Sequence, residues 1–243
     1  MIVTEDEVAA DLPFVMALRS GDIPAINAML AANSDSANAG LAVRGNRTRT
    51  PLQVVTDWPG YYPNAPEVVR LLIAAGADPD GCVGAPPSET PLHWAASSDD
   101  LDVAAALIDG GADLEAQGAS IAGGSPLDDA VGYGCWHVAR LLVARGARVD
   151  RLWHAAALGL LERLTELTAT DPPPSQDDIN EAFWQACHGG QRRAAEHLLG
   201  RGANPNVTPD YSQDSPLGSR AAPTPAGARS RNGSAPSEQR RAT

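Results

Sequence analysis

The histidine and aspartate residues near position 150 have the types that acid–base chemistry uses. His154 with Asp129 or Asp150 could supply a general base and the carboxylate that orients it. The sequence adds no nucleophile elbow and no oxyanion donor beside them, and acyl transfer needs both. An enzyme that uses His154 and nearby acids is therefore kept only as an alternative, and we expect no catalytic residue.

Patterns that would hold a metal or a phosphate are incomplete. Cys135-Trp-His137 and Cys187-His188 have no second pair at zinc spacing. Residues 78–89 place acids as a calcium loop does, but Val83 stands where such a loop needs glycine. The sequence has no lysine, so a phosphate-binding loop with its lysine is absent. We expect no metal and no cofactor.

The elements that would position these residues are best seen between Thr90 and Glu115. Thr90 can cap a helix, and Pro91 suits the first helical position, where no N–H donor is needed. Apolar residues recur at helical spacing from Leu101 to Ile108, and Gly110-Gly111 supplies a stop. Two short antiparallel helices of this size cannot bury a shared apolar side alone, so the unit needs neighbours of its own kind.

The run Thr90-Pro-Leu-His-Trp-Ala-Ala96, followed by Gly111-Ala-Asp113, resembles the ankyrin repeat. Gly76 and Gly111 are 35 residues apart, as are Gly111 and Gly146, close to the ankyrin unit of about 33 residues. The resemblance covers roughly residues 12–206. It implies an all-α ankyrin-repeat solenoid of about six helix-turn-helix repeats with short finger loops, in which His93 hydrogen-bonds to the backbone between repeats.

We predict one repeat domain over residues 1–214, with acids at its start that would cap the first repeat, and a polar connector over residues 33–49. Repeats are expected near residues 12–32, 50–80, 90–115, 125–150, 151–170 and 178–206. Repeat three has Asp99 where the other helix turns have glycine. Repeat five follows Asp150 directly, which leaves almost no room for a finger loop. An insertion at 57–66 carries Trp58, Tyr61 and Tyr62, and we favour their packing onto the scaffold over binding.

Residues 215–243 are rich in Ala, Pro, Ser, Arg and Gly and show no helical apolar pattern, which predicts a disordered tail. The tail begins Ser215-Pro-Leu217, a copy of Ser125-Pro-Leu127. This copy suggests the hypothesis that a change of reading frame has replaced a last repeat. A truncated product without a working role is then a further alternative.

The net charge of the chain is −12. Its tail holds five arginines against one glutamate, so the part before Ser215 carries −16. Such an acidic body argues against nucleic acid as a partner. The acidic start is no secretory signal, and no apolar run is long enough to cross a membrane. We expect a cytoplasmic monomer, and the Arg-, Ala-, Gly- and Pro-rich composition favours a bacterial source.

The resemblance also implies a contact surface on the finger tips and on the concave side of the first helices. Carried onto this sequence, the candidate partner-binding residues are Trp94, Ser97, Asp129, Tyr133, His154 and His188. An exposed Trp94 beside Tyr133, Asp129 and His154 would form a hot-spot patch. The alternative is that Trp94 packs on the adjoining finger. Trp153 and Trp184 are expected to pack between repeats.

The expected function is a non-catalytic protein–protein interaction module. An alternative of the same kind is an acidic inhibitor or immunity-type partner of a basic protein, because the body carries so much negative charge. The sequence names no partner.

Overall fold

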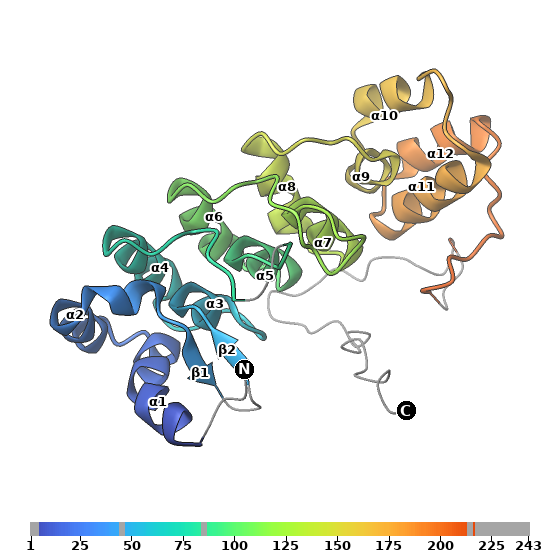
Figure 1. The fold of residues 1–243 in the computed structure, drawn as a ribbon. Helices are drawn as coiled ribbons and strands as arrows, with labels where there is room; N and C mark the ends of the chain where they lie inside the picture. The colour runs from blue at the N-terminus through green and yellow to red at the C-terminus, as the bar shows by residue number, and fades with distance from the viewer. Residues whose placement is uncertain (1–4, 44–46, 84–86, 213–215, 217–243) are drawn as a thin grey trace, which may run out of the picture.

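The computed structural model describes residues 5–43, 47–83, 87–212 and 216, and these fold into a stack of helix pairs (Figure 1). The first helices of the pairs are α1 (Glu5–Ser20), α3 (Pro51–Thr56), α5 (Pro91–Ser97), α7 (Pro126–Gly132), α9 (Leu152–Leu158) and α11 (Gln176–His188). The second helices are α2 (Ile23–Ala32), α4 (Ala65–Ala74), α6 (Leu101–Asp109), α8 (Trp136–Ala144), α10 (Leu161–Thr168) and α12 (Arg192–Gly200). The predicted solenoid of about six helix-turn-helix repeats is confirmed over this part of the chain. Each helix pair is called a repeat below.

The loop from the second helix of one repeat to the first helix of the next is called a finger. The first finger contains a 3-10 helix, η1 (Ser34–Asn38), and the antiparallel strands β1 (Leu41–Val43) and β2 (Arg47–Arg49). All three residues of β1 are buried, and Asp11 of α1 accepts the backbone N–H of Ala42 at 2.7 Å. The polar connector predicted for residues 33–49 is thus a hairpin packed on α1, because Leu41, Ala42 and Val43 bury an apolar run.

The first repeat starts earlier than the boundary predicted near residue 12. Helix α1 begins at Glu5, and Pro13 lies inside it. Proline removes one helical N–H donor, and the pattern therefore placed a helix start there. Phe14 and Leu18 are both buried in the core, so the helix continues through Pro13 into its apolar contacts.

Four of the first helices start at a capping box, including the one predicted at Thr90. Thr50, Thr90, Ser125 and Ser175 each form a capping box with the residue three positions later, which is Gln53, His93, Asp128 or Asp178. Each box satisfies two backbone donors that the first helical turn leaves open. The His93 ring accepts the Thr90 N–H at 3.0 Å, and its other nitrogen lies 3.3 Å from the Gly124 carbonyl oxygen. The predicted inter-repeat role of His93 is confirmed.

The turn between helices in repeat three departs from glycine, as predicted. Gly134 and Gly159 occupy this turn with φ of +71° and +69°, and Asp99 adopts φ +56° in the same place. A side chain at such a φ is strained, and aspartate is among the few residues that tolerate it. A compensating interaction is therefore expected at Asp99.

The apolar core is divided at the junction between repeats four and five. One cluster extends from Phe14 to Ala157, and a second extends from Leu152 to Ala203. The loop from α8 to α9 spans only residues 145–151. The finger before repeat five is thus short, as predicted.

Three observations complete the fold. Within the described residues, no helix is long and apolar enough to cross a membrane. Cys82, Cys135 and Cys187 are free thiols. Apart from Pro216, the tail predicted over residues 215–243 lies outside the described residues, as does the hypothesis of a lost last repeat.

Candidate functional site

Asp129 of α7 anchors a finger and is not on the surface. Its Oδ1 accepts the Ser120 hydroxyl at 2.9 Å and the Ile121 N–H at 3.0 Å, and the residue is fully buried. Burial raises its pKa to about 7 with help from the Glu89 charge, although the bonds from Ile121 and Ser120 oppose the shift. The prediction of Asp129 as a contact residue is therefore wrong, because the finger covers the carboxylate.

Tyr133 stays on the surface at the end of α7. It is 39% exposed, and its hydroxyl lies 2.9 Å from the Ser120 hydroxyl. The phenol is thus fixed by the same finger that covers Asp129. A tyrosine held in one position by a hydrogen bond suits a binding surface, since little side-chain entropy is lost on contact.

Trp94 of α5 packs against the adjoining finger. The Arg49 guanidinium of β2 lies 4.5 Å from its ring centroid, and its indole N–H donates to Glu89 at 3.2 Å. Trp94 is half-buried, so the packing alternative is the better description. Ser97, one turn later, is half-buried and donates to the Trp94 carbonyl oxygen at 3.1 Å.

His154 is buried at the junction between repeats four and five. It is 2% exposed, and its Nε2 lies 3.6 Å from Asp128 Oδ1. The carboxylate beside it is thus that of Asp128 and not the expected one of Asp129 or Asp150. Arg151 Nε lies 2.6 Å from the same Asp128 oxygen. Burial by itself would raise the pKa of Asp128, but His154, Ser125 and Arg151 together lower it. His154 thus lies beside a buried carboxylate in the core, and the predicted patch of Trp94, Tyr133, Asp129 and His154 does not form.

The short loop explains why this pair exists. In repeat three, His93 reaches the base of the next finger at Gly124. In repeat four the equivalent residue is Asp128, and no finger follows, so Arg151 and His154 occupy the space. A buried carboxylate needs a charged or hydrogen-bonding partner. The signal in the sequence was the acid in the histidine position, followed by a basic residue directly before α9.

His188 lies at the end of α11 inside an aromatic row. Its ring stacks on Trp184 with centroids 4.9 Å apart, and it meets Trp136 of α8 edge-on at 5.4 Å. Trp153 is half-buried against both core clusters, so its predicted packing between repeats is confirmed. Trp184 is buried, and its packing between repeats stays a prediction. His188 is half-buried, and its role in partner binding stays a prediction.

The insertion at residues 57–66 is fixed through its backbone while two aromatic rings face outward. The Tyr61 N–H donates to Asp100 at 2.7 Å, and its hydroxyl donates to the Asp99 carbonyl oxygen at 2.6 Å. Trp58 and Tyr61 are nonetheless exposed, and only Tyr62 is half-buried. The favoured packing interpretation therefore holds for the chain path and for Tyr62, but not for the rings of Trp58 and Tyr61.

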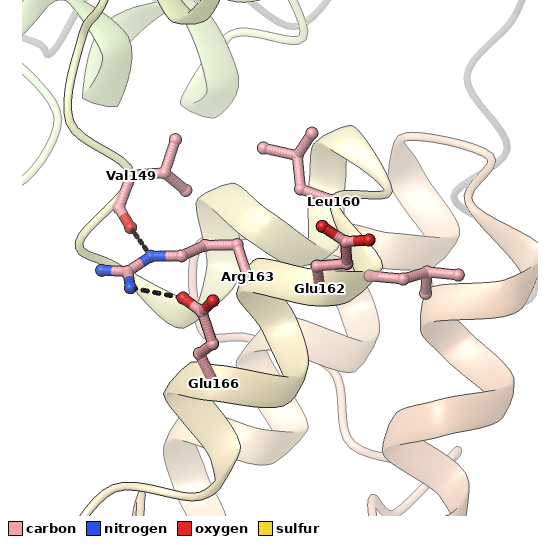
Figure 2. A pocket seen from close by; sticks show the side chains of 6 residues that line it. Val149, Leu160, Glu162, Arg163 and Glu166 are labelled. Atoms are coloured by element: carbon pink, nitrogen blue, oxygen red, sulfur yellow. Dashed lines mark hydrogen bonds and ion pairs between the residues drawn. The ribbon is translucent and has the colours of Figure 1, made fainter.

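A cavity of about 470 Å³ lies beside the divided core, lined by Val149, Leu160, Leu161, Glu162, Arg163 and Glu166 (Figure 2). Arg163 Nε donates to the Val149 carbonyl oxygen at 2.8 Å, and its Nη1 donates to Glu166 at 2.9 Å. The cavity contains no nucleophile or histidine. Among the described residues, no group of three His, Cys, Asp or Glu side chains could hold a metal ion.

Comparison with known proteins agrees with this geometry. Residues 60–151 match the family model described as ankyrin repeats (3 copies). This stretch of the chain therefore consists of ankyrin repeats. The crystal structure of the ankyrin repeat domain of Bcl-3, a member of the IkappaB protein family, has the same fold. The TM-score is 0.53 and the sequence identity 23%, over 86% of this chain and 94% of that one. No curated protein sequence matches the chain.

The ankyrin repeats leave a distinct set of apolar side chains exposed. Among the described residues, five of the large ones come from first helices or from the turns that follow them: Leu12, Met16, Trp58, Tyr61 and Tyr133. Two are on second helices, Leu101 and Leu199, one is in a finger, Val83, and one is in the segment after α12, Tyr211. Of these, Tyr133 is one of the candidate partner-binding residues predicted from the sequence, whereas Tyr61 was expected to pack.

Proposed function

We propose that this ankyrin repeat chain is a non-catalytic module that binds another protein through the first-helix side of the stack and its finger loops. The observation that carries the proposal is the exposure of Met16, Trp58, Tyr61 and Tyr133 on first helices and their turns. Aromatic side chains and methionine are the groups that protein interfaces prefer. Ankyrin repeats generally serve as protein-binding modules, which agrees with this reading.

The placement of the reactive groups supports a role without catalysis. His93, Asp128 and His154 are buried and join neighbouring repeats. Asp129 holds a finger in place. A catalytic base has to reach a substrate proton, and a buried side chain that joins two repeats does not. The proposed setting is the cytoplasm, with the chain as a monomer and neither nucleic acid nor membrane as its target.

Capture of a partner from the lysate of the source cell tests the proposal. The immobilised chain is compared with Met16→Ala and Tyr133→Ala, and with Leu199→Ala on a second helix as the matched control. Titration of the purified captured protein should show a loss of about tenfold or more for Tyr133→Ala, the size typical of a tyrosine hot spot. Equal affinity for the chain and all three variants would remove the first-helix side as the binding surface.

The net charge of −12 favours a basic protein as the partner, as an inhibitor or immunity-type module would have. Electrostatic attraction between exposed charges is screened within about 8 Å at physiological ionic strength. Affinity for such a partner should therefore fall steeply between about 0.05 and 0.5 M salt, because screening becomes strong over this range. Affinity that stays constant over this range rejects the basic partner while leaving the binding role intact.

A further inference from the structure

The segment after α12 folds back onto α11. Asn180 of α11 accepts the Asn204 N–H at 2.8 Å, and this bond turns the chain toward the first helix. Tyr211 then meets Trp184 edge-on, with ring centroids 5.7 Å apart at 85°. Its hydroxyl donates to Glu181 and accepts from Gln185 Nε2 at 3.3 Å. A tyrosine from the chain itself is thus seated on α11 through its ring edge and its hydroxyl.

The receiving side chains are fixed in the core. Trp184 is buried, and Gln185 is only 4% exposed. Gln185 Nε2 also donates to Glu181 at 3.2 Å, which holds the carboxylate and the amide together. The Trp184 ring stacks on His188, which fixes its plane. Glu181, Trp184 and Gln185, called the tyrosine slot below, are therefore preorganised before anything binds them.

Tyr211 occupies this slot incompletely. It remains 66% exposed. The buried Gln185 Oε1 has no hydrogen-bond partner among the described residues. A buried acceptor without a donor costs about 1–3 kcal/mol, so a ligand that supplies one N–H beside its phenol would bind better than Tyr211 does. A peptide backbone in extended conformation offers such donors at every other residue.

We propose that Glu181, Trp184 and Gln185 form a receptor for a tyrosine side chain on an extended segment of a partner protein, and that Tyr211 fills it until the partner displaces it. The hydroxyl is the specific feature, because its bond to the Glu181 carboxylate is charge-assisted and phenylalanine lacks it. Although most of the Tyr211 ring is exposed, loss of solvent around its hydroxyl, and then Glu181, raise the pKa of Tyr211, so a phenol in this slot stays protonated and donates. A phosphorylated tyrosine is excluded, since its charge would face Glu181.

This inference rests on the proposed function, because α11 is the first helix of repeat six and lies on the side of the stack that is proposed to bind a partner. It deepens that function by naming the chemistry of the partner at this end.

A titration followed by NMR tests the slot with a peptide that copies residues 204–212, Asn-Pro-Asn-Val-Thr-Pro-Asp-Tyr-Ser. The observed signal is the indole N–H of Trp184 in the full chain, assigned with Trp184→Phe. In Tyr211→Ala the slot is empty. The peptide concentration that half-saturates the shift should therefore be at least tenfold lower for this variant than for the unaltered chain. A peptide with phenylalanine or phosphotyrosine in place of tyrosine should bind at least tenfold more weakly.

Two further variants keep the test decisive. Tyr211→Phe retains the ring and should give an intermediate half-saturation, and Glu181→Gln combined with Tyr211→Ala should lose the preference for tyrosine over phenylalanine. The inference is overturned if Tyr211→Ala and the unaltered chain respond alike, if both peptides bind equally, or if no shift occurs. Partner capture that still depends on Tyr133 would then show that the slot has failed while the proposed function stands. If the peptide binds but neither Tyr133→Ala nor Met16→Ala changes partner capture, the slot stands and the proposed first-helix surface has failed.

Discussion

The carboxylate of Asp99 lies 2.7 Å from the ring nitrogen Nδ1 of His137, although the two residues belong to different repeats. The same carboxylate accepts the backbone N–H groups of His137 at 3.1 Å and Val138 at 3.0 Å. These are the second and third residues of α8, whose own preceding residue, Cys135, provides no side-chain cap. Asp99 is therefore the N-terminal cap of a helix in the next repeat, which explains why aspartate replaces glycine at φ +56°.

This dual role predicts an order of stability for three substitutions. Asp99→Gly removes the cap and relieves the backbone, and should lower the free energy of unfolding by about 1 kcal/mol. Asp99→Ala removes the cap and keeps a side chain at positive φ, and should cost about 1–2 kcal/mol more than glycine. Asp99→Asn keeps an acceptor oxygen and should lie closest to the unaltered chain. Urea unfolding measures all three, and alanine as stable as glycine would contradict the assignment.

Asp99 also shows what the sequence could predict. Its position in the helix turn could be predicted because Gly134 and Gly159 follow Leu127 and Leu152 by seven residues. Such local spacing depends directly on backbone geometry. Capping boxes and the 35-residue period are local in the same way. The bond partner of Asp99 was not visible, because His137 lies 38 residues away and only the stacking of repeats brings it near.

The candidate site was harder to predict for a related reason. The position of Asp129 is exposed at Met16 in repeat one but buried at His154 and Gln185 in repeats five and six. At Asp129 itself, the path of a finger decides whether the side chain is covered. Irregular loops leave no period in the sequence, so the cover from Ser120 and Ile121 could not be predicted. Similarly, Tyr211 reaches Glu181 only because the segment after α12 turns back.

His93 should make the fold sensitive to mild acid. Burial lowers the pKa of His93 below its ordinary 6.5. At a pH between the two pKa values, His93 is therefore protonated in the unfolded chain and neutral in the folded chain. The contribution of His93 is present in full above pH 6.5 and is lost as the pH falls toward the folded pKa. In repeat two, Gln53 holds the same position and forms the same capping box. We expect His93→Gln to stay within about 1 kcal/mol at pH 7.5 and to lose less stability at pH 5.

Urea midpoints at the two pH values measure this difference. His93→Ala is the control, because it loses both hydrogen bonds and should be less stable than the unaltered chain by about 1–3 kcal/mol at pH 7.5, with a smaller deficit at pH 5. If His93→Gln and the unaltered chain declined by the same amount between pH 7.5 and pH 5, the titration of His93 would not be the cause.

Asp129 should make the fold less stable as the pH rises, which is opposite to the effect of His93. Its pKa is raised to about 7, so the folded chain retains a proton that the unfolded chain releases near pH 4. Stability from this group therefore declines as the pH rises from about 4 to about 7, and it stays low above that. Asp129→Asn remains neutral and still accepts from Ser120 and Ile121. It should raise the free energy of unfolding at pH 8 by about 1–3 kcal/mol and change it little at pH 4.5.

The control for this variant is Asp102→Asn, which removes an exposed acid from α6 without freeing a buried group. It should change stability equally at both pH values. A loss of stability in Asp129→Asn at pH 8 would mean that the finger needs the ionised carboxylate, and the burial argument would then be wrong.

Gly189 should be intolerant of any side chain because it allows α9 and α11 to approach. A Cβ built at Gly189 would lie 2.1 Å from the Ala157 carbonyl oxygen, which is backbone and cannot move aside. Gly200, at the end of α12, has nothing within 4 Å of its Cβ position. Gly189→Ala should therefore lower the free energy of unfolding by about 1–3 kcal/mol through an overpacked contact. Gly200→Ala should raise it by about 0.5–1 kcal/mol, because the unfolded chain loses conformational entropy.

Urea unfolding measures both values. Hydrogen exchange of the α11 amides should become faster in Gly189→Ala alone, because only that variant forces α9 and α11 apart. Effects of the same sign in both variants would show that helix propensity, and not the contact with Ala157, sets the response.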